Sequence, residues 1–513
     1  MKKILAALLC LLLAASAFTG CNPQIMDGDG MVYYGTQGNM LKLTDSDFYD
    51  GTLEGVKIEE AGWVKALVLE DGATEGTFTS HEYGAPDFVR MVACWNAAIY
   101  EGGAVEIWAR AQVDGEWTDW LSWGRFTPYE TRGSRKNKKC DGAYIDEDTF
   151  IVSGGYASAL QMKAVLTRAA ADDPSPALRE MTMTLSGGDA KPTYIESGAL
   201  DELPDKALCT APAICQEIRY GSIADSICSP TTMTVMLDSR GEALLPEEVA
   251  LVCLDHGEDI FGSWSFTCAA GGLYGYECYC QYADENILMQ ELAKGRVCGL
   301  SVKYAPKRGK GLPVLDGTCG STNGHLIAII GYEYEDGIRD DEHLYFYSSD
   351  SYADGDEYCY RRYSWQQLSL CWESRMAYIM PTDGIVTPPC LRSEQVKVEF
   401  LPNNEYRLQH EDGTPFSDDE LYTFIRGDGI LAYAAPVDNE DLKNGGLASD
   451  HSIVYEQPMT TAANWKFSYT HMMSDGRFKI DVPALREYWN VPADRSILLY
   501  AIGEDGHVYI TML

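Results

Sequence analysis

The sequence predicts a multidomain α+β chain, with an N-terminal β-sandwich, a mixed α and β domain in the middle and a C-terminal β-rich domain. Three observations lead to this order. Residues 56–190 alternate apolar and polar side chains, residues 198–385 combine capped helices with apolar strands, and residues 393–513 return to strand-like alternation. A chain of 513 residues is long enough for roughly two to four domains with separate hydrophobic cores.

Residues 1–20 have the form of an export signal. Lys2 and Lys3 precede the apolar stretch "ILAALLCLLLAASAF", which is too short and too early for a resident transmembrane helix. The stretch ends at "FTGC", which resembles the lipobox of bacterial lipoproteins. This resemblance implies that Cys21 carries a lipid and tethers the protein to the outer side of the cytoplasmic membrane in the bacterial cell envelope. An ordinary secretory signal with a secreted product is the alternative.

The region after the signal is expected to begin with a tether. Residues 21–55 are rich in Gly and Asp and show little periodicity, which predicts a spacer. In the following region, "GAVEIWARAQVDGEWTDWLSWGRF" alternates around Asp114-Gly115, a dipeptide typical of a β-hairpin turn. Five tryptophans there are expected mostly in the sandwich core, and a sugar-binding face is the alternative reading. They are Trp95, Trp108, Trp117, Trp120 and Trp123.

The stretch "SICSPTTMTVML" in the middle domain reads as the start of a helix. Proline is tolerated at the first helical position, so Pro230 predicts a cap at Ser229, and Gly241 supplies the stop. Cys228 then lies just ahead of a helix N-terminus, where unpaired N–H groups and the helix dipole favour an anion. The thiol is either a reactive thiolate or a buried structural side chain.

Further elements of the middle domain follow from caps and apolar runs. Helices are expected from Pro246, between Asp284 and Gly295, and after Ser364, which has Gln367 in capping-box spacing. The apolar runs "VCGLSV", "HLIAIIGY" and "HLYFYSS" predict strands. The C-terminal domain shows strand patterns such as "VKVEFL" and no recognisable chemistry.

Three residues complement Cys228 in the way that a cysteine nucleophile requires. The nucleophile needs a base, a group that orients the base, and donors for the oxyanion. His325 opens an apolar strand, Asp350 follows the next strand, and Gln216 can donate an amide N–H. Each has an ordinary reading as a packed histidine, a carboxylate of a solvated loop or a surface amide.

Four segments together resemble a known family. "ICQEIRYG", "ICSPTTMTVML", "STNGHLIAIIGY" and "YSSDSYA" resemble the secreted relatives of bacteriocin-processing (double-glycine) peptidases, the peptidase C39-like family with a papain-like α+β fold. The resemblance covers about a third of the chain. It implies Cys228 as nucleophile, His325 as base, Asp350 as orienting group and Gln216 as oxyanion donor. Ser351 follows Asp350 where the family usually has proline. The preceding block, with its tryptophans, is similar to a β-sandwich that often precedes this domain.

Asn323 and Asp316 are the alternative partners for His325 if Asp350 belongs only to an acidic loop. The function expected from this resemblance is a lipid-anchored cysteine peptidase that hydrolyses peptide or amide bonds through a thioester on Cys228. Its partner would be a peptide or protein substrate, and the membrane would be contacted through the lipid only. Neither a metal nor an organic cofactor is required. A catalytically inactive surface binding protein and an acyl transferase with the same thioester chemistry are the alternatives.

Composition and weaker motifs narrow the function classes. A formal charge of −37 disfavours nucleic acid and anionic lipid as partners, while 46% hydrophobic residues argue against disorder. "CYC" at 278–280 has the wrong spacing for a zinc knuckle, and "DSYADGDE" lacks the spacing of an EF-hand loop. "RGD" at 426–428 reads as a hairpin turn. Without Cys10, Cys21 and Cys228, the remaining cysteines are odd in number, so disulfide pairing cannot be complete within one chain.

Overall fold

The computed structural model describes residues 40–391 except for 101, 129–131, 136–137, 188–201, 218–222, 243, 310, 373 and 388. Outside that range it describes mainly the backbone of separate strands. The export signal predicted for residues 1–20, the lipid attachment predicted at Cys21 and the "RGD" sequence at 426–428 lie outside the described residues.

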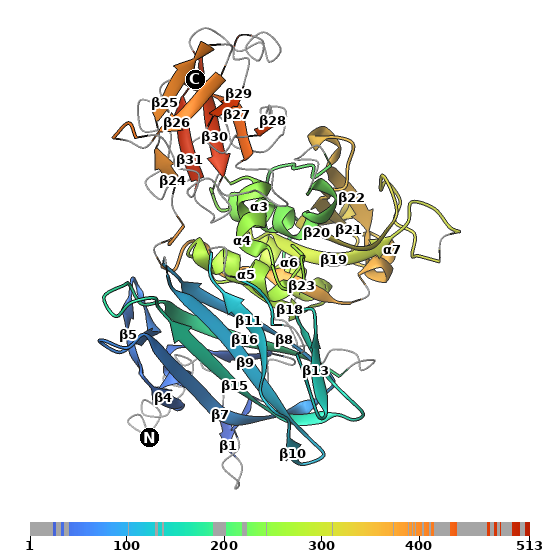
Figure 1. The fold of residues 1–513 in the computed structure, drawn as a ribbon. Helices are drawn as coiled ribbons and strands as arrows, with labels where there is room; N and C mark the ends of the chain where they lie inside the picture. The colour runs from blue at the N-terminus through green and yellow to red at the C-terminus, as the bar shows by residue number, and fades with distance from the viewer. Residues whose placement is uncertain are drawn as a thin grey trace, which may run out of the picture.

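The N-terminal region consists of two mainly antiparallel sheets of eight strands each (Figure 1, blue to teal). The first contains β1 (Gln24–Met26), β2 (Val32–Tyr34), β4 (Thr52–Glu54), β7 (Glu75–Phe88), β9 (Ala104–Val113), β10 (Glu116–Trp117), β11 (Leu121–Phe126) and β15 (Ala157–Thr167). The second contains β3 (Met40–Leu43), β5 (Val56–Ala61), β6 (Val64–Leu69), β8 (Arg90–Ala98), β12 (Lys139–Cys140), β13 (Ala143–Asp146), β14 (Thr149–Val152) and β16 (Ala177–Ser186). The short helix α2 (Asp45–Phe48) follows β3.

The predicted hairpin is confirmed. Asp114 and Gly115 join β9 to β10 with φ values of 51° and 85°, the left-handed conformations that a two-residue hairpin turn requires. The prediction that the tryptophans lie in the sandwich core is confirmed for only two of the five, Trp95 and Trp123, which are buried. The other three, Trp108, Trp117 and Trp120, are half-buried and lie against Arg110, Arg135 or Lys163.

The spacer predicted for residues 21–55 is wrong, since β1, β2, β3, α2 and β4 all lie within it. Residues 40–43 pair with β16, and the side chains of Leu41, Leu43 and Phe48 are buried in the N-terminal core. A four-residue strand places only two side chains inward, which is too short a pattern for alternation to reveal.

The middle region is built on a seven-stranded sheet in which every pairing is antiparallel. Its order is β18 (Tyr279–Tyr282), β23 (Met376–Ile379), β19 (Cys298–Tyr304), β20 (Thr322–Tyr334), β21 (Leu344–Ser349) and β22 (Tyr360–Ser364), and β17 (Lys206–Leu208) also pairs with β20. The helices are α3 (Cys228–Asp238), α4 (Pro246–Cys253), α5 (Trp264–Leu273), α6 (Glu285–Ala293) and α7 (Trp365–Cys371), with 3₁₀ turns η2 (Ala224–Ser226), η3 (Glu335–Gly337) and η4 (Asp356–Tyr358).

The helix starts predicted from the sequence are confirmed in part. Asp284 caps α6, because its Oδ1 accepts the N–H of Ile287 at 2.9 Å. Ser364 precedes α7 as predicted but makes no side-chain cap bond. The predicted cap at Ser229 is wrong, since α3 begins at Cys228, two residues before Pro230. Proline anywhere in the first turn lacks only an N–H that has no intrahelical partner, so it does not fix the start to one residue.

The strand pattern predicted for residues 393–513 is confirmed. The described strands are β24 (Ser393–Gln395), β25 (Lys397–Leu401), β26 (Glu405–Gln409), β27 (Leu431–Asp438), β28 (Tyr469–His471), β29 (Arg477–Lys479), β30 (Arg495–Ile502) and β31 (Val508–Met512). They form a sheet of five strands and a sheet of three.

The N-terminal sheets and the middle region share one continuous hydrophobic core. Helix α5 lies directly on β8, and Gly272 is a point of close approach between them. A Cβ atom at Gly272 would lie 3.0 Å from Cα of Asn96 and 3.3 Å from the nitrogen of Ala97. The backbones of α5 and β8 are therefore so close that a side chain at position 272 would press on β8.

We expect Gly272→Ala to lower the free energy of unfolding by about 1–3 kcal/mol, because a methyl group there presses on the backbone of β8. Gly262→Ala is the matched control, since a Cβ atom at Gly262 meets nothing within 4 Å. Chemical denaturation of both variants measures the difference, and equal stabilities would contradict the close packing.

Candidate active site

Three elements of the middle region bring Cys228, His325 and Asp350 together. Cys228 is the first residue of α3, and α3 packs on β20, which carries His325. Asp350 directly follows β21, the antiparallel neighbour of β20. The end of β21 lies beside the apolar half of β20, since Ser349 pairs with Ala328. Strand pairing thus places a residue after β21 close to a residue before Ala328.

The imidazole of His325 is held by a buried carboxylate. Nε2 of His325 lies 2.8 Å from Oδ1 of Asp350, and Asp350 has no exposed surface. The hydroxyls of Tyr363 and Tyr304 donate to Oδ2 of Asp350 at 2.8 and 3.2 Å, and the N–H of Tyr352 donates to Oδ1 at 3.1 Å. Burial alone would raise the pKa of Asp350, but the charge and hydrogen bond of His325, the charge of Arg361 and the Tyr363 hydroxyl hold it below its usual value.

The thiol of Cys228 contacts the same imidazole. Burial disfavours both the thiolate of Cys228 and the imidazolium of His325, yet the hydrogen bond between them lowers the pKa of Cys228. The N–H groups of Leu326 and Ser229 add to this lowering. The pKa of His325 is raised against its burial, mainly by the charge of Asp350. Since Nε2 faces Asp350, Nδ1 is the nitrogen that remains for Cys228. The pair therefore favours the thiolate–imidazolium form, and Cys228 keeps partial exposure.

Gln216 is fixed beside the nucleophile helix. Its Nε2 donates to the carbonyl of Ala224 at 2.8 Å, just ahead of α3, and its Oε1 accepts from Oγ of Ser351 at 2.7 Å. The backbone N–H of Gln216 donates to the carbonyl of Ser351 at 2.9 Å. An amide NH₂ group has two donors, so the contact with Ala224 leaves one of them for another acceptor.

The alternative partners for His325 are engaged elsewhere or exposed. Oδ2 of Asp316 accepts from Nε2 of Gln367 at 2.7 Å, and Asn323 is an exposed residue of β20. The acidic residues after Asp350 also have other roles. Asp354 is exposed, while Oδ1 of Asp356 accepts the N–H of Cys215 at 2.6 Å. Among the candidates named from the sequence, Asp350 is the one in contact with His325.

Side chains missed by the sequence analysis complete the surroundings of Asp350 and Gln216. Tyr304 on β19 and Tyr363 on β22 supply the hydroxyls, and Ser351 orients the amide of Gln216. Tyrosines are frequent in strands, and nothing in their spacing distinguishes these two. Ser351 was visible as the departure from proline, and its contact gives that departure a structural meaning.

The "CYC" sequence lies beside another thiol, which comes from the N-terminal sheets. Sγ of Cys280 lies 3.2 Å from Sγ of Cys94, which comes from β8. All cysteines in the described part of the chain are free thiols. Within the same residues, no group of three or more His, Cys, Asp or Glu side chains is arranged to hold a metal ion.

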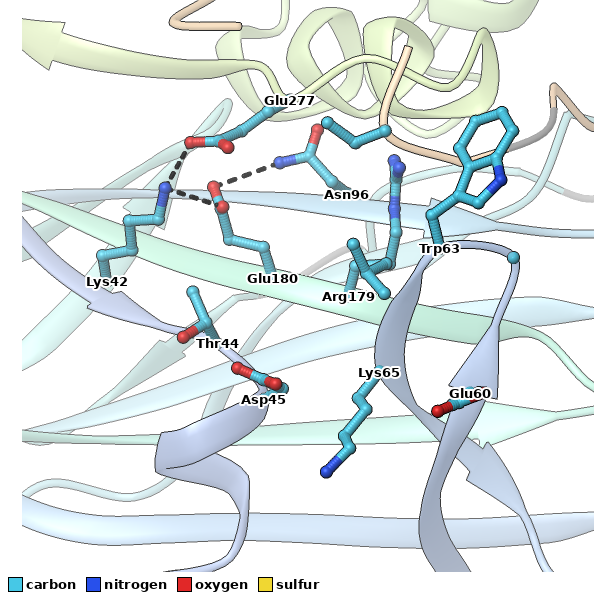
Figure 2. Close-up of a pocket in the computed structure, with 13 residues that line it drawn as sticks. Lys42, Thr44, Asp45, Glu60, Trp63, Lys65, Asn96, Arg179, Glu180 and Glu277 are labelled. Carbon is cyan, nitrogen blue, oxygen red and sulfur yellow. Dashed lines mark hydrogen bonds and ion pairs between the residues drawn. The ribbon is translucent and has the colours of Figure 1, made fainter. Parts of the chain in front are cut away.

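A cavity of about 600 Å³ lies away from this site, between the N-terminal sheets and the middle region (Figure 2). None of Gln216, Cys228, His325 and Asp350 lines it. Its inner polar groups already bond to one another: Lys42 bridges Glu180 and Glu277, and Asn96 donates to Glu180 (Figure 2). This network joins β3, β8 and β16 to the segment before β18.

The described helices include none that combines the length and the apolar character needed to cross a membrane.

Comparison with solved structures gives only weak likenesses. The C-terminal CBM6 of LamC, a laminarinase from Zobellia galactanivorans, aligns with 28% of the chain and 99% of its own length, at 11% identity and a TM-score of 0.18. TmCBM61, solved with β-1,4-galactotriose, aligns over 30% of the chain and 92% of its own length, at 11% identity and a TM-score of 0.17. The carbohydrate recognition domain of Emp47p covers 32% of the chain and all of its own length, at 10% identity and a TM-score of 0.18. TM-scores this low carry no argument about fold or ligand.

Two family models match the chain, each over a separate segment. No curated protein matches the chain. Residues 42–186 match the family described as the peptidase C39 N-terminal domain, and residues 210–379 match the peptidase C39-like family. The second match contains Gln216, Cys228, His325 and Asp350. Residues 210–379 are therefore similar to the peptidase C39-like family, and residues 42–186 before them are similar to the peptidase C39 N-terminal domain.

Proposed function

We propose that the protein is a cysteine peptidase that hydrolyses peptide or amide bonds through a thioester on Cys228. The observation that carries the proposal is the contact chain from Asp350 through His325 to Cys228. In this arrangement the nucleophile, the base and the orienting carboxylate each touch the next, as the chemistry requires. The similarity of residues 210–379 to the peptidase C39-like family supports the same reaction class.

The proposed reaction uses the thiolate–imidazolium pair in two steps. The Cys228 thiolate attacks the carbonyl carbon, and the His325 imidazolium gives its proton to the leaving amine, which leaves a thioester. Water then attacks the thioester while His325 accepts a proton, and release of the acid restores the thiolate and the imidazolium. The second N–H of the Gln216 amide and the Cys228 backbone N–H hold the oxyanion in both steps.

The proposal includes an extracytoplasmic location through a lipid on Cys21, for which the support is the "FTGC" junction after the apolar stretch. The substrate is a peptide or protein that meets the protein outside the cytoplasm. A formal charge of −37 favours a neutral or basic substrate over an acidic one.

The first test is the reactivity of Cys228 against pH. We expect iodoacetamide to alkylate Cys228 at pH 6 more than about tenfold faster than Cys140, because an ordinary thiol is roughly 0.3% ionised there. Cys140 is the matched control, since it is also half-buried but burial raises its pKa. Mass spectrometry of the adducts against pH gives both rates.

His325→Ala should abolish this preference, while Gln216→Ala should preserve it, because the amide serves the oxyanion and not the thiolate. Peptidase activity should fall on the acid side as the Cys228 thiolate takes up its proton, below the usual pKa of a thiol. It should fall on the alkaline side as His325 loses its proton, above the usual pKa of histidine. Equal alkylation of Cys228 and Cys140 in the wild type would favour an inactive binding protein.

The second test concerns the orienting carboxylate. Asp350→Asn should lower turnover by about 10²-fold or more, because the amide neither stabilises the imidazolium nor fixes its tautomer. Asp354→Asn is the matched control on the same loop, and its side chain is exposed. The measurement is cleavage of a peptide selected from a fluorogenic library, with and without an added amine acceptor. Similar losses in both variants would remove Asp350 from the mechanism, and product that requires the amine would indicate an acyl transferase.

The third test concerns the anchor. Cys21→Ser should release the protein from the membrane fraction into the medium, because the lipidation site is lost while the export signal remains. Mass spectrometry of the mature N-terminus checks the same point, with a lipid-modified Cys21 expected. An unmodified N-terminus at another residue would contradict the anchor and leave the peptidase proposal standing.

A further inference from the structure

Side chains of the N-terminal sheets bind both ends of helix α5. Asp148, in the turn between β13 and β14, accepts the backbone N–H of Trp264, the first residue of α5. Arg179 of β16 donates from Nη2 to the carbonyls of Gly272 and Tyr276 at 3.0 and 3.3 Å, at the other end of the helix. Asp148 and Arg179 are both buried.

This arrangement matches the polarity of a helix. The first turn of a helix has N–H groups without intrahelical acceptors, and the last turn has carbonyls without donors. Asp148 places an acceptor at the first end and Arg179 places donors at the second. Gly272, whose carbonyl Arg179 binds, also lets the last turn of α5 approach β8 closely. The N-terminal sheets therefore contact α5 at both of its ends and, through β8, along its length.

Helix α5 in turn holds the residue next to the nucleophile. Oγ1 of Thr267 on α5 lies 3.1 Å from Oγ of Ser229, and the hydroxyl of Tyr378 on β23 lies 2.7 Å from the same atom. The ring of Trp264 packs on the ring of Tyr378, with centroids 4.6 Å apart. Ser229 is buried, and its side chain is thus fixed by α5 both directly and through Tyr378.

Ser229 directly follows the nucleophile in the first turn of α3. Its backbone N–H contributes to lowering the pKa of the Cys228 thiol, which favours the thiolate. A shift of Ser229 would move that N–H, together with the first turn of α3, relative to the sulfur. Contacts from Asp148 to Trp264, from α5 to Ser229 and from Ser229 to Cys228 thus form one continuous path between the N-terminal sheets and the nucleophile.

We propose that the N-terminal sheets position the nucleophile of the middle region, with Asp148 and Thr267 acting as positioning residues through α5 and Ser229. The inference rests on the proposed role of Cys228 as a nucleophile. It gives the region similar to the peptidase C39 N-terminal domain a part in forming the active site, beyond that of an independent accessory module.

The test measures alkylation of Cys228 by iodoacetamide against pH in the full-length protein. Thr267→Val removes the hydroxyl without changing the shape of the side chain, and Asp148→Ala removes the acceptor for Trp264. In both variants we expect the rate at pH 6 to fall roughly three- to tenfold, as for the loss of one hydrogen bond, and the midpoint of the profile to move to higher pH. Thr267→Ser and Asp148→Asn keep an oxygen at each position and should restore most of the rate.

Lys42→Met is the control for a purely structural effect. It breaks the ion pairs of Lys42 with Glu180 and Glu277, which lie at the same boundary between the regions. Neither of these two partners belongs to α5, and neither is Ser229. This variant should lose stability in thermal unfolding and keep the wild-type pH profile of Cys228.

The outcomes separate this inference from the proposed function. A normal wild-type profile that Thr267→Val and Asp148→Ala leave unmoved would overturn the positioning role and leave the peptidase proposal intact. Thr267→Val decides alone if Asp148→Ala does not fold. A wild-type Cys228 that reacts like an ordinary thiol would overturn both.

Discussion

The hydrogen bond between His325 and Asp350 is the interaction on which the rest of the candidate site depends. A carboxylate without exposed surface is stable in its charged form only when its oxygens are paired or hydrogen-bonded. Asp350 meets that condition through His325, Tyr363, Tyr304 and the N–H of Tyr352. Because the carboxylate stays charged, the imidazolium is favoured, and because the imidazolium is favoured, so is the Cys228 thiolate. The thiolate of Cys228 and the imidazolium of His325 thus both depend on the buried charge of Asp350.

This requirement explains why four neighbouring strands converge on one carboxylate. His325 comes from β20 and Asp350 follows β21, while the tyrosine hydroxyls come from β19 and β22 on either side. The sheet order β19-β20-β21-β22 therefore places all of these groups within reach without any long connection. An antiparallel sheet suits this task, since strand pairing brings the end of β21 beside the part of β20 that follows His325.

The sequence predicted the parts of the site that lie at ends of regular elements. Cys228 at a helix start, His325 at the start of an apolar run and Asp350 after a strand are visible because periodicity changes there. Tyr304, Tyr363 and Asp148 were not predictable, because their roles depend on partners between 13 and 116 residues away in the chain. The strand at 40–43 was missed for a related reason, since its pairing partner β16 lies far along the chain. The helix start was placed one to two residues late, because a proline in the first turn does not fix the first helical residue.

Ser351 shows how a departure from the family pattern connects the two halves of the site. A proline after Asp350 would have no hydroxyl, whereas Oγ of Ser351 donates to Oε1 of Gln216, and the Ser351 carbonyl accepts the N–H of Gln216. The amide proposed to hold the oxyanion is thus tied to the residue that follows the orienting carboxylate. The base and the oxyanion donor are supported by the sheet and its loops, while the nucleophile is supported by α3 and, through Ser229, by α5. The two supports meet at Cys228 and His325, so the geometry of that pair depends on how accurately the N-terminal sheets and the middle region pack together.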